Sequence, residues 1–414
     1  MMRLTAIVLF SFFLLSCSQK QETIIWKSIE KSLQTQFITV NDGDTIQLPE
    51  GNFMFTQSLL MDGKKNITIL GAGKDKTILS FKNQTDGAQG MYITHGENII
   101  VQDFTIQDAK GDNIKVSEVR NLTLRNIRAK WTGEPSNANG AYALYPVLCK
   151  NVLLEGCEAI GSSDAGIYVG QSDSVIIRNN LAYWNVAGIE SENSKYVEIY
   201  GNEAYNNTGG ILIFDLPGLS TYGHTTKVYK NNVHDNNHEN FATPGNVVAS
   251  IPPGTGMLIL ATHMLELTDN DIKDNTSVGV GIISYDLVAA LNEGVEQQTD
   301  AIGGVQSVNN RYKEDSLYYS YPYDIKIHHN RFSNHNWFPS LGNDIGKLLL
   351  FKSFGSPPDI LFDGIPAPDR PDRGICIEEN SEVLFIDLDA AREFENLSMD
   401  ASKFACNPKS TLVK

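Results

Sequence analysis

Residues 164–207 read DAGIYVGQSDSVIIRNNLAYWNVAGIESENSKYVEIYGNEAYNN, and the second half of this stretch repeats the first. Corresponding residues lie 22 positions apart: Gly166 and Gly188, Val175 and Val197, Ile177 and Ile199, Asn180 and Asn202, Ala182 and Ala204, and Asn185 and Asn207. A period of about this length, made of short apolar alternations broken by Gly, Asn and Ser, is typical of a repeat architecture. Further copies are therefore expected along the chain.

Each repeat contains strands that are too short to stand alone. Ile167 and Val169 alternate with Tyr168 and Gly170, which is the pattern of a short strand. No run between the strands is long enough for a crossover helix, so a parallel sheet built from βαβ units is excluded. The sequence predicts an all-β fold, a right-handed parallel β-helix in which each repeat makes one coil of three short strands.

Two marker positions, Gly166 and Asn180, recur along the chain. Five marker pairs are 14 residues apart and three have extra residues between them: Gly90/Phe104, Asn113/Ile127, Gly166/Asn180, Gly188/Asn202, Gly256/Asn270, and then Ala141/Cys157, Gly210/Asn232, Gly279/Asn330. With earlier coils expected near Ile46 and Ile67, about 8–10 coils are predicted. The Asn markers favour an inward ladder of amide hydrogen bonds; the alternative is that Asn only tolerates a left-handed turn.

The N-terminal segment is interpreted as a targeting signal. Arg3 precedes an apolar run from Leu4 to Leu15 that is too short to span a bilayer, so residues 1–16 are predicted to be a signal peptide. The LLSC sequence resembles the lipobox of bacterial lipoproteins, which implies a lipid on Cys17, a tether at residues 17–22 and, because Ser18 follows, the outer membrane. The alternative is an ordinary secreted protein with an incidental cysteine.

The net charge excludes one class of function, and the positions of the cysteines predict their roles. Without residues 1–16 the chain has 32 basic and 49 acidic residues, a formal charge of −17. Nucleic-acid binding, which requires clustered cations, is therefore excluded, and no second membrane segment is expected. A disulfide is predicted between Cys376 and Cys406, since export permits it, whereas Cys149 and Cys157 are expected to be small core residues.

The remaining segments are assigned by their periodicity. Ile25, Ile29 and Leu33 follow helical spacing, so residues 23–40 are predicted to hold a capping helix and the entry to the coil. Residues 41–338 are assigned to the β-helix. Residues 339–414 show no period and are expected to cap the second end.

One outward face is expected to carry the functional residues. Loops inserted at the turns flank the strand that follows each first marker. The outward positions form two rows up the axis: Tyr92, Lys115, Ala143, Tyr168, Glu190, Leu212, Leu258, Gly281, and Thr94, Ser117, Tyr145, Gly170, Glu192, Phe214, Leu260, Ile283. From Leu212 onward the face is apolar, so the long loops are expected to cover it.

Below that cover the face is polar and aromatic, and a trough that binds a sugar chain is predicted there. Its binding residues are Lys115, Tyr145, Asp164, Tyr168, Glu190, Glu192 and Asp215. Tyr rings stack on the apolar faces of sugars, and carboxylates accept hydroxyl protons.

The chemistry of this trough is left open, and no catalytic residue is assigned. Glu190 and Glu192 would lie roughly 6.5–7 Å apart, near the separation in an inverting glycosidase. Neighbours on one strand face the same side, however, so two solvated acids are the favoured interpretation. If the protein is an enzyme, a uronic-acid lyase or epimerase is favoured over a hydrolase, with Lys115, Tyr145 or Tyr168 as base. No cofactor is predicted, except that this alternative would need calcium, held by Asp164, Glu190 or Asp215.

Several segments also resemble a known family. GAYALYPVLCKNV, SSDAGIYVGQS, NVAGIESENS, NNTGGILIFDLPG and IPPGTGM are similar to a bacterial family of secreted or lipidated parallel β-helix repeat proteins of unassigned function. The resemblance implies the fold and export but no activity. The wider superfamily of carbohydrate-binding and sugar-hydrolase β-helices includes pectate lyases, polygalacturonases and alginate epimerases. The short catalytic motifs of the polygalacturonases and the epimerases are missing here, so the resemblance to these enzymes is one of fold only.

Two functions follow as hypotheses. The first is a monomeric, lipid-anchored cell-envelope protein that binds, or binds and processes, a polysaccharide in the trough. The second is a non-enzymatic scaffold that docks another envelope protein through the apolar upper face at Phe214 and Leu258.

Overall fold

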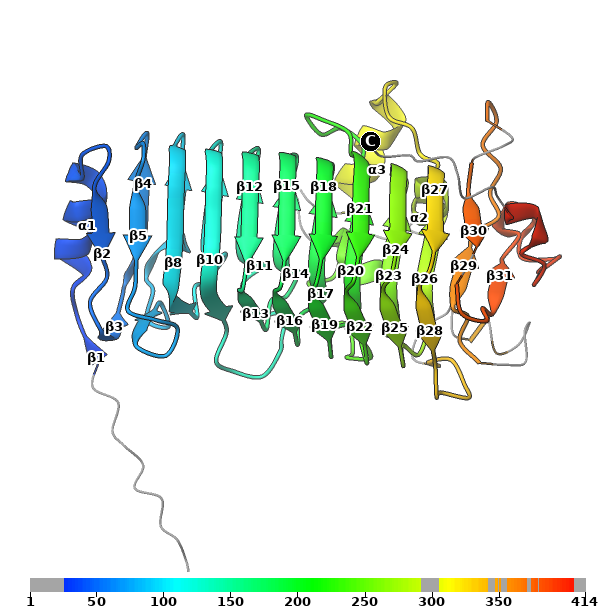
Figure 1. Ribbon diagram of the computed structural model, residues 1–414, viewed down its shortest axis with the longest axis horizontal. Coiled ribbons are helices and arrows are strands. Elements are labelled where there is room, and N and C mark those ends of the chain that lie inside the picture. Colours follow the sequence, from blue (N-terminus) through cyan, green and yellow to red (C-terminus); the bar gives the residue numbers. More distant parts are fainter. Residues whose placement is uncertain are drawn as a thin grey trace, which may run out of the picture.

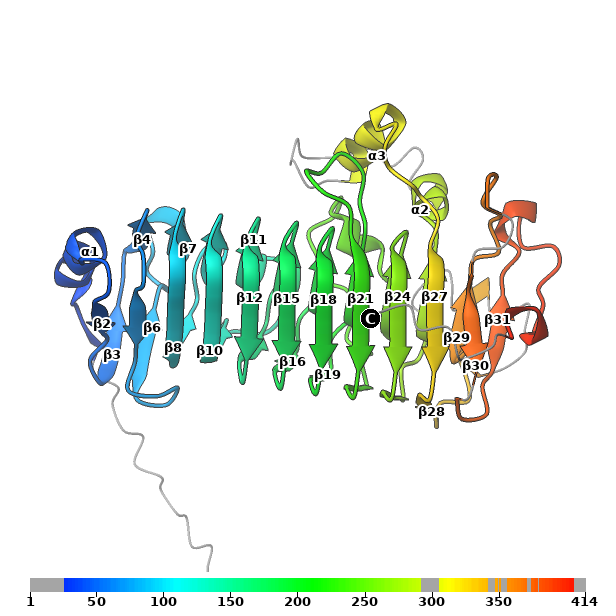
Figure 2. The same cartoon turned by 45° about the horizontal axis from the view of Figure 1, so that its top comes forward.

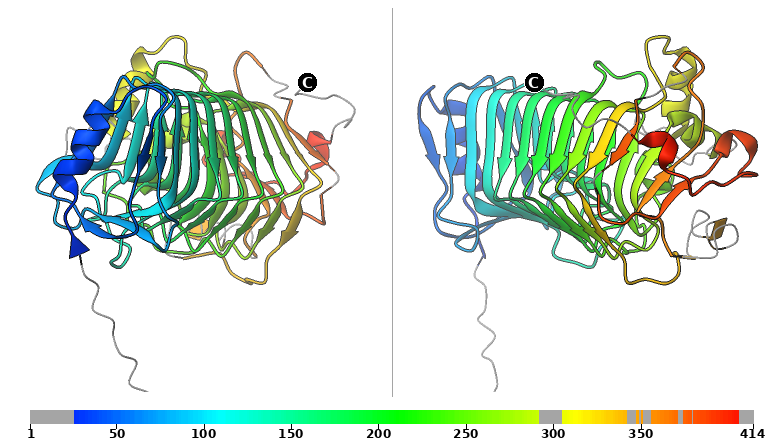
Figure 3. Two further views of the ribbon diagram at one scale, coloured as in Figure 1. Left: turned by 60° about the vertical axis from the view of Figure 1, so that its left-hand side comes forward. Right: turned by 45° about the vertical axis from the view of Figure 1, so that its right-hand side comes forward.

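The computed structural model describes residues 26–291, 305–341, 347, 348, 350, 356–370, 374–378 and 380–405. The signal peptide, the tether and Cys17 lie outside the described residues. The described chain is a parallel β-helix with three walls, and each coil passes from wall three to wall one and then to wall two (Figure 1; seen toward the ends in Figure 3). The predicted fold class is confirmed.

The strands stack in register along each wall. Wall one contains β2 (Thr45–Gln47), β5 (Thr68–Leu70), β8 (Glu97–Gln107), β10 (Arg120–Lys130), β12 (Lys150–Glu155), β15 (Asp173–Arg178), β18 (Lys195–Tyr200), β21 (His224–Tyr229), β24 (His263–Thr268), β27 (Tyr323–His328) and β30 (Cys376–Glu378). Wall two contains β1 (Trp26–Lys27), β3 (Gly51–Met54), β6 (Thr77–Ser80), the second halves of β8 and β10, β13 (Glu158–Ile160), β16 (Leu181–Tyr183), β19 (Glu203–Tyr205), β22 (Asn232–His234), β25 (Asp271–Lys273) and β28 (Arg331–Ser333).

Wall three forms a separate sheet, which has eleven strands among the described residues. These are β4 (Gln57–Asp62), β7 (Asp86–Thr94), β9 (Ile114–Ser117), β11 (Tyr142–Val147), β14 (Ala165–Gly170), β17 (Ala187–Glu192), β20 (Gly209–Phe214), β23 (Thr255–Leu260), β26 (Val278–Ile283), β29 (Ile360–Phe362) and β31 (Phe385–Asp387). The stack therefore has more coils than the repeat markers indicated.

Helices lie at both ends and on one side of the stack, with two 3-10 turns (Ala390–Arg392 and Ser402–Phe404) at the C-terminal end. The helix α1 (Glu30–Thr39) covers the open first coil with the buried side chains of Leu33 and Phe37. It begins later than predicted, because Trp26–Lys27 pairs with β3 as a strand. The helices α2 (Tyr285–Leu291) and α3 (Val305–Glu314) and a short 3-10 turn (Val247–Ser250) lie in insertions. Within the described residues, no helix is long and apolar enough to cross a membrane.

The stack extends beyond the boundary predicted at residue 338. Strand β29 pairs with β26, β31 pairs with β29, and β30 pairs with β27. The long insertion between β26 and β29 hides this period in the sequence. Cys376 is disulfide-bonded, but Cys406, its predicted partner, lies outside the described residues. Cys149 and Cys157 are free thiols in the core, as expected.

Inward asparagines form ladders at two corners, not one. The first ladder contains Asn180, Asn202, Asn231, Asn270, Asn330 and Asn380. The second contains Asn185, Asn207, Asn236 and Asn275. The residue before a ladder Asn, such as Lys230 (φ 55°) or Asp269 (φ 56°), adopts the left-handed conformation. Because the ladder residues do not, the hydrogen-bonding interpretation is confirmed.

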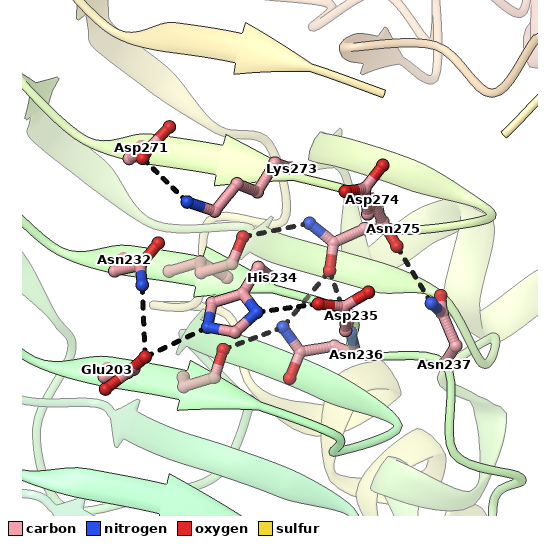
Figure 4. A network of polar contacts seen from close by, with 12 residues as sticks. Glu203, Asn232, His234, Asp235, Asn236, Asn237, Asp271, Lys273, Asp274 and Asn275 are labelled. Carbon is pink, nitrogen blue, oxygen red and sulfur yellow. Dashed lines mark hydrogen bonds and ion pairs between the residues drawn. The ribbon is translucent and has the colours of Figure 1, made fainter. Parts of the chain in front are cut away.

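Two predicted markers were wrong. The ladder residue is Asn231, because its amide bonds to Asn270, whereas Asn232 points outward and donates to Glu203 (Figure 4). In the coil whose second marker is Cys157, the first marker is Ala143 and not Ala141. Leu144 pairs with Ile167, so the residue before it, Ala143, aligns with the marker Gly166. In each case a residue of the same type lies one or two positions from the true marker, so spacing in the sequence alone could not tell the two apart.

Candidate functional site

The predicted outward row lies on one wall. Pairing of β7, β9, β11, β14, β17 and β20 places Tyr92, Lys115, Tyr145, Tyr168, Glu190 and Leu212 side by side in that order. The shared wall, on which the predicted trough depends, is thus confirmed. Tyr145 belongs to this row and not to the second row, a direct consequence of the misplaced marker at Ala141.

The apolar end of wall three is covered, as predicted. Leu212 and Phe214 are buried in a second hydrophobic cluster that lies outside the coil. Side chains from the 216–223 loop, the 241–251 loop, α2 and α3 pack in the same cluster; in Figure 2 the helices stand over this part of the stack. We refer to these four segments as the cover. Because the cover buries Phe214, this face is not open to the docking partner of the scaffold hypothesis.

Polar contacts hold the cover together. The Asp315 carboxylate, directly after α3, accepts hydrogen bonds from the Gly218 N–H group (2.6 Å) and the Tyr222 hydroxyl group. The Tyr318 hydroxyl donates to the Asp215 carbonyl oxygen at 2.6 Å. Asp215 is buried, and its carboxylate accepts a hydrogen bond from the Gly223 N–H group at 2.9 Å. Asp215 therefore anchors the 216–223 loop, instead of lining an open trough.

Beside the cover lies a group of acids and tyrosines that we call the acid–tyrosine cluster. It consists of Asp112, Lys115, Tyr142, Tyr145, Asp164, Tyr168, Glu190 and Glu192. Strands β9, β11, β14 and β17, or the residues just before them, supply all eight. The short period-two strands of consecutive coils bring these side chains to one face.

Three tyrosine rings form the centre of the acid–tyrosine cluster. The ring centroids of Tyr142 and Tyr145 are 4.5 Å apart, those of Tyr142 and Tyr168 are 4.6 Å apart, and those of Tyr145 and Tyr168 are 4.9 Å apart. The Tyr168 hydroxyl donates to Glu192 Oε1 at 2.8 Å, and the Tyr142 hydroxyl donates to Asp164 Oδ2 at 3.3 Å. The Lys115 ammonium lies 4.8 Å from the Tyr145 ring centroid, a cation–π distance.

The acid–tyrosine cluster has a buried floor and an accessible rim. Tyr168 (4% exposed), Glu190 (2%) and Asp164 (7%) are buried, whereas Lys115, Tyr145 and Glu192 are partly exposed. The prediction of two solvated glutamates was therefore wrong for Glu190.

Burial changes the acidity of all four carboxyl groups. It raises the pKa of Asp112 to about 6 and that of Asp164 to about 7, and the negative charge of Glu192 adds to the effect on Asp164. Burial also raises the pKa of Glu190 well above its ordinary range, with further contributions from Asp164 and Glu192. The pKa of Glu192 is raised by burial, while the hydrogen bond from Tyr168 opposes the shift. Burial therefore favours the protonated form of each of these acids, relative to the same group in water.

Glu190 is the least satisfied of these acids. Its Oε2 atom is buried and has no hydrogen-bond partner within the described chain. None of the ion pairs between described residues involves Asp112, Asp164 or Glu190. An unpaired buried acid costs stability, so its presence is typical of a functional site.

The sequence reasoning missed Asp112 and Tyr142. A first marker at Ala143 would have aligned Tyr142 with Ala165, next to Asp164. Among the described residues, no group of three or more His, Cys, Asp or Glu side chains is placed to hold a metal ion. The arrangement is suited to hydrogen bonding with sugar hydroxyl groups and to proton transfer.

The chain is similar to several known proteins. It is 24% identical over 321 residues to the preneck appendage protein of Bacillus phage PZA, covering 66% of this chain and 36% of that protein. The chain spans about a third of the length of such relatives. The Azotobacter vinelandii mannuronan C-5 epimerase AlgE4 A-module is 15% identical, with a TM-score of 0.47 over 82% of this chain and 86% of that chain. The Dettilon tailspike protein is 12% identical, with a TM-score of 0.46 over 74% and 59%. Residues 136–292 match the family model described as the right handed beta helix region, and the chain is a right-handed parallel β-helix.

Proposed function

We propose that the protein binds a polysaccharide along wall three, with the rim of the acid–tyrosine cluster as the contact surface. The supporting observation is the unpaired, buried Glu190 carboxyl behind an accessible rim of Lys115, Tyr145 and Glu192. Amphipathic Tyr side chains and carboxyl groups match the apolar faces and hydroxyl groups of sugars. Because the cluster crosses consecutive coils, the bound chain would run along the axis of the β-helix.

Affinity electrophoresis against immobilised neutral and uronic-acid polysaccharides tests this proposal. Lys115→Gln removes the cation at the rim, and we expect it to weaken retention of a uronic-acid polymer about tenfold. Lys227→Gln is the matched control, because Lys227 lies on wall one in an ion pair with Glu266 (3.3 Å). Absence of retention of the wild type on every polymer, or equal retention of both variants, would contradict the proposal.

A second candidate is proton transfer on a uronic acid, as in a lyase or an epimerase. The raised pKa of Glu192 suits a general base, and Lys115 would balance the sugar carboxylate. Burial raises the pKa values of Tyr145 and Tyr168, so these phenols suit proton donors better than bases. Incubation of polyuronates with the protein should then yield unsaturated uronates or epimerised sugars. Glu192→Gln should abolish the product, whereas Glu203→Gln, on wall two, should retain it.

The cellular placement is also proposed. The LLSC sequence at residues 14–17 supports a lipid anchor on Cys17 and attachment to the bacterial envelope, with the outer membrane as destination. Metabolic labelling with a radioactive fatty acid should mark the wild type but not Cys17→Ser. Labelling of both chains, or of neither, would exclude the anchor.

A further inference from the structure

A groove with a volume of about 590 Å³ lies on the outer surface of wall one. It crosses β8, β10, β12, β15 and β18, or roughly 19 Å at about 4.8 Å per coil. Its lining residues are Asn98, Ile100, Asn121, Leu122, Thr123, Asn151, Val152, Leu153, Ser174, Val175, Ile176, Tyr196 and Glu198. None of them belongs to wall three, so the groove is separate from the acid–tyrosine cluster.

One side of the groove is a ladder of exposed amides. Asn98 donates to Asn66 (2.6 Å), Asn121 to Asn98 (2.6 Å) and Asn151 to Asn121 (2.8 Å), each through its side-chain amide. These residues adopt a left-handed conformation, for example φ 55° at Asn121. The ladder uses one N–H of each donating amide, and the second has no partner within the described chain.

The floor of the groove is a row of outward side chains that is unusually apolar. Ile100, Thr123, Leu153 and Ile176 stand side by side on consecutive strands and are partly exposed. The same row continues as Glu198, Lys227, Glu266 and Lys326, where charges alternate. Outward strand positions normally carry polar residues, so the change from charged to aliphatic within one row marks a contact surface.

The lining excludes several kinds of occupant. Glu198 is its only charged residue, and no Lys or Arg lines it, so an anionic ligand such as a nucleic acid would find no counter-charge. The backbone N–H and C=O groups of β10, β12 and β15 pair with the strands above and below. An extended peptide therefore could not bind by adding a strand.

We propose that this groove binds a neutral, linear glycan that runs along the axis of the β-helix. Amides both donate and accept hydrogen bonds, as hydroxyl groups do, and the aliphatic row suits the apolar faces of sugar rings. The ladder fixes the amides before binding, so little side-chain freedom is lost on binding. Tyr196, which is 55% exposed at one end, offers an aromatic ring to a terminal sugar. This site is independent of the one proposed on wall three.

Calorimetric titration with neutral hexasaccharides of β-1,4-glucan, α-1,4-glucan, β-1,3-glucan and β-1,4-mannan tests the inference. Thr123→Arg places a long charged side chain in the middle of the groove, and we expect it to weaken binding of the best ligand at least about tenfold. Thr68→Arg is a matched control, because Thr68 occupies the same row beside Ile100 but does not line the groove. It should bind within about twofold of the wild type, and melting curves of the two variants should agree.

The outcomes separate this groove from the wall-three site. Binding that Thr123→Arg weakens and Lys115→Gln leaves unchanged supports the groove, whether or not wall three binds a polysaccharide. If no neutral hexasaccharide binds the wild type, or if Thr123→Arg binds like Thr68→Arg, the inference is overturned. Loss of binding in Lys115→Gln alone would assign the neutral glycan to the acid–tyrosine cluster and also overturn it.

Discussion

The Asp164 carboxyl shows how the site reduces the stability of the fold. Burial raises its pKa from 3.8 to about 7, so the folded chain holds this proton more tightly than the unfolded chain does. Below pH 3.8, ionisation of Asp164 therefore takes nothing from the free energy of unfolding. The loss grows as the pH rises from 3.8 to about 7 and is complete above that value. Glu190 and Glu192, whose pKa values are also raised, change stability in the same direction.

Removing the Asp164 carboxyl should therefore stabilise the protein at alkaline pH. For Asp164→Asn we expect the melting temperature at pH 8 to rise by roughly 2–4 °C, the shift that about 1 kcal/mol produces. At pH 4 it should not change, since Asp164 is then protonated in the folded chain. Thermal denaturation followed by circular dichroism at both pH values measures this.

Asp271→Asn is the control of opposite sign. A hydrogen bond from Arg331 lowers the pKa of Asp271, so its charge stabilises the fold, and this contribution is lost as the pH falls through that lowered value. The variant should be less stable than the wild type at pH 8. If Asp164→Asn is destabilised at pH 8, as Asp271→Asn is, the interpretation of Asp164 as a buried acid with a raised pKa is refuted.

The inward asparagines provide a second test at the scale of single residues. Asn231 accepts from Asn202 and donates to both the Ile199 carbonyl oxygen (2.9 Å) and Asn270 Oδ1 (2.9 Å). Asn231→Ala leaves these buried groups unpaired and should cost about 2–4 kcal/mol in the free energy of unfolding. Within the described part of the chain, the side chain of its neighbour Asn232 makes one hydrogen bond, to Glu203 at 3.2 Å.

Asn232→Ala is thus a matched control for the ladder. We expect it to cost less than about 1 kcal/mol, because the bond to Glu203 faces the surface. Chemical denaturation of both variants gives the comparison. Equal costs at the two positions would mean that the ladder contributes no more than an ordinary surface contact.

Among the elements, the cover joins segments that lie far apart in the chain, and polar contacts link them. Asp315, next to α3, is bonded to Gly218 and Tyr222, which lie almost a hundred residues earlier in the chain. Asp315→Ala removes both bonds, so the 216–223 loop should open more often and be cleaved several times faster by chymotrypsin. Mass spectrometry of the first fragments locates the cut.

Glu314→Ala separates this effect from a change in α3 itself. Glu314 is exposed, and its side chain makes no hydrogen bond to another described residue. Its cleavage rate should match that of the wild type. If Asp315→Ala is cleaved no faster than Glu314→Ala, the two bonds do not hold the cover.

The elements also show why some features could be predicted and others could not. Alternation along β14 and β17 and the 22-residue spacing decide which side chains share a wall, so the row through Tyr168, Glu190 and Leu212 was predictable. The burial of Tyr168 and Glu190 was not, because it depends on how the cover and the tyrosines of β11 pack. Spacing alone gives no such information.

At the scale of the molecule, the two proposed sites occupy different walls of one stack. The acid–tyrosine cluster lies on wall three beside the cover, and the groove with the amide ladder lies on wall one. Each strand contributes one or two side chains, and the parallel register repeats them along the axis. A β-helix built this way suits ligands that are themselves linear and repetitive.

The central claim, that wall three binds a polysaccharide, is tested most directly by one dissociation constant. It is measured in the Thr123→Arg background, so that the groove on wall one does not contribute, for the polysaccharide that this chain binds best. Adding Tyr145→Phe, which removes a hydroxyl group at the rim, should weaken binding about tenfold, whereas adding Tyr183→Phe on wall two should change it less than about twofold. No binding to any polysaccharide, or equal binding by the two variants, would contradict the account.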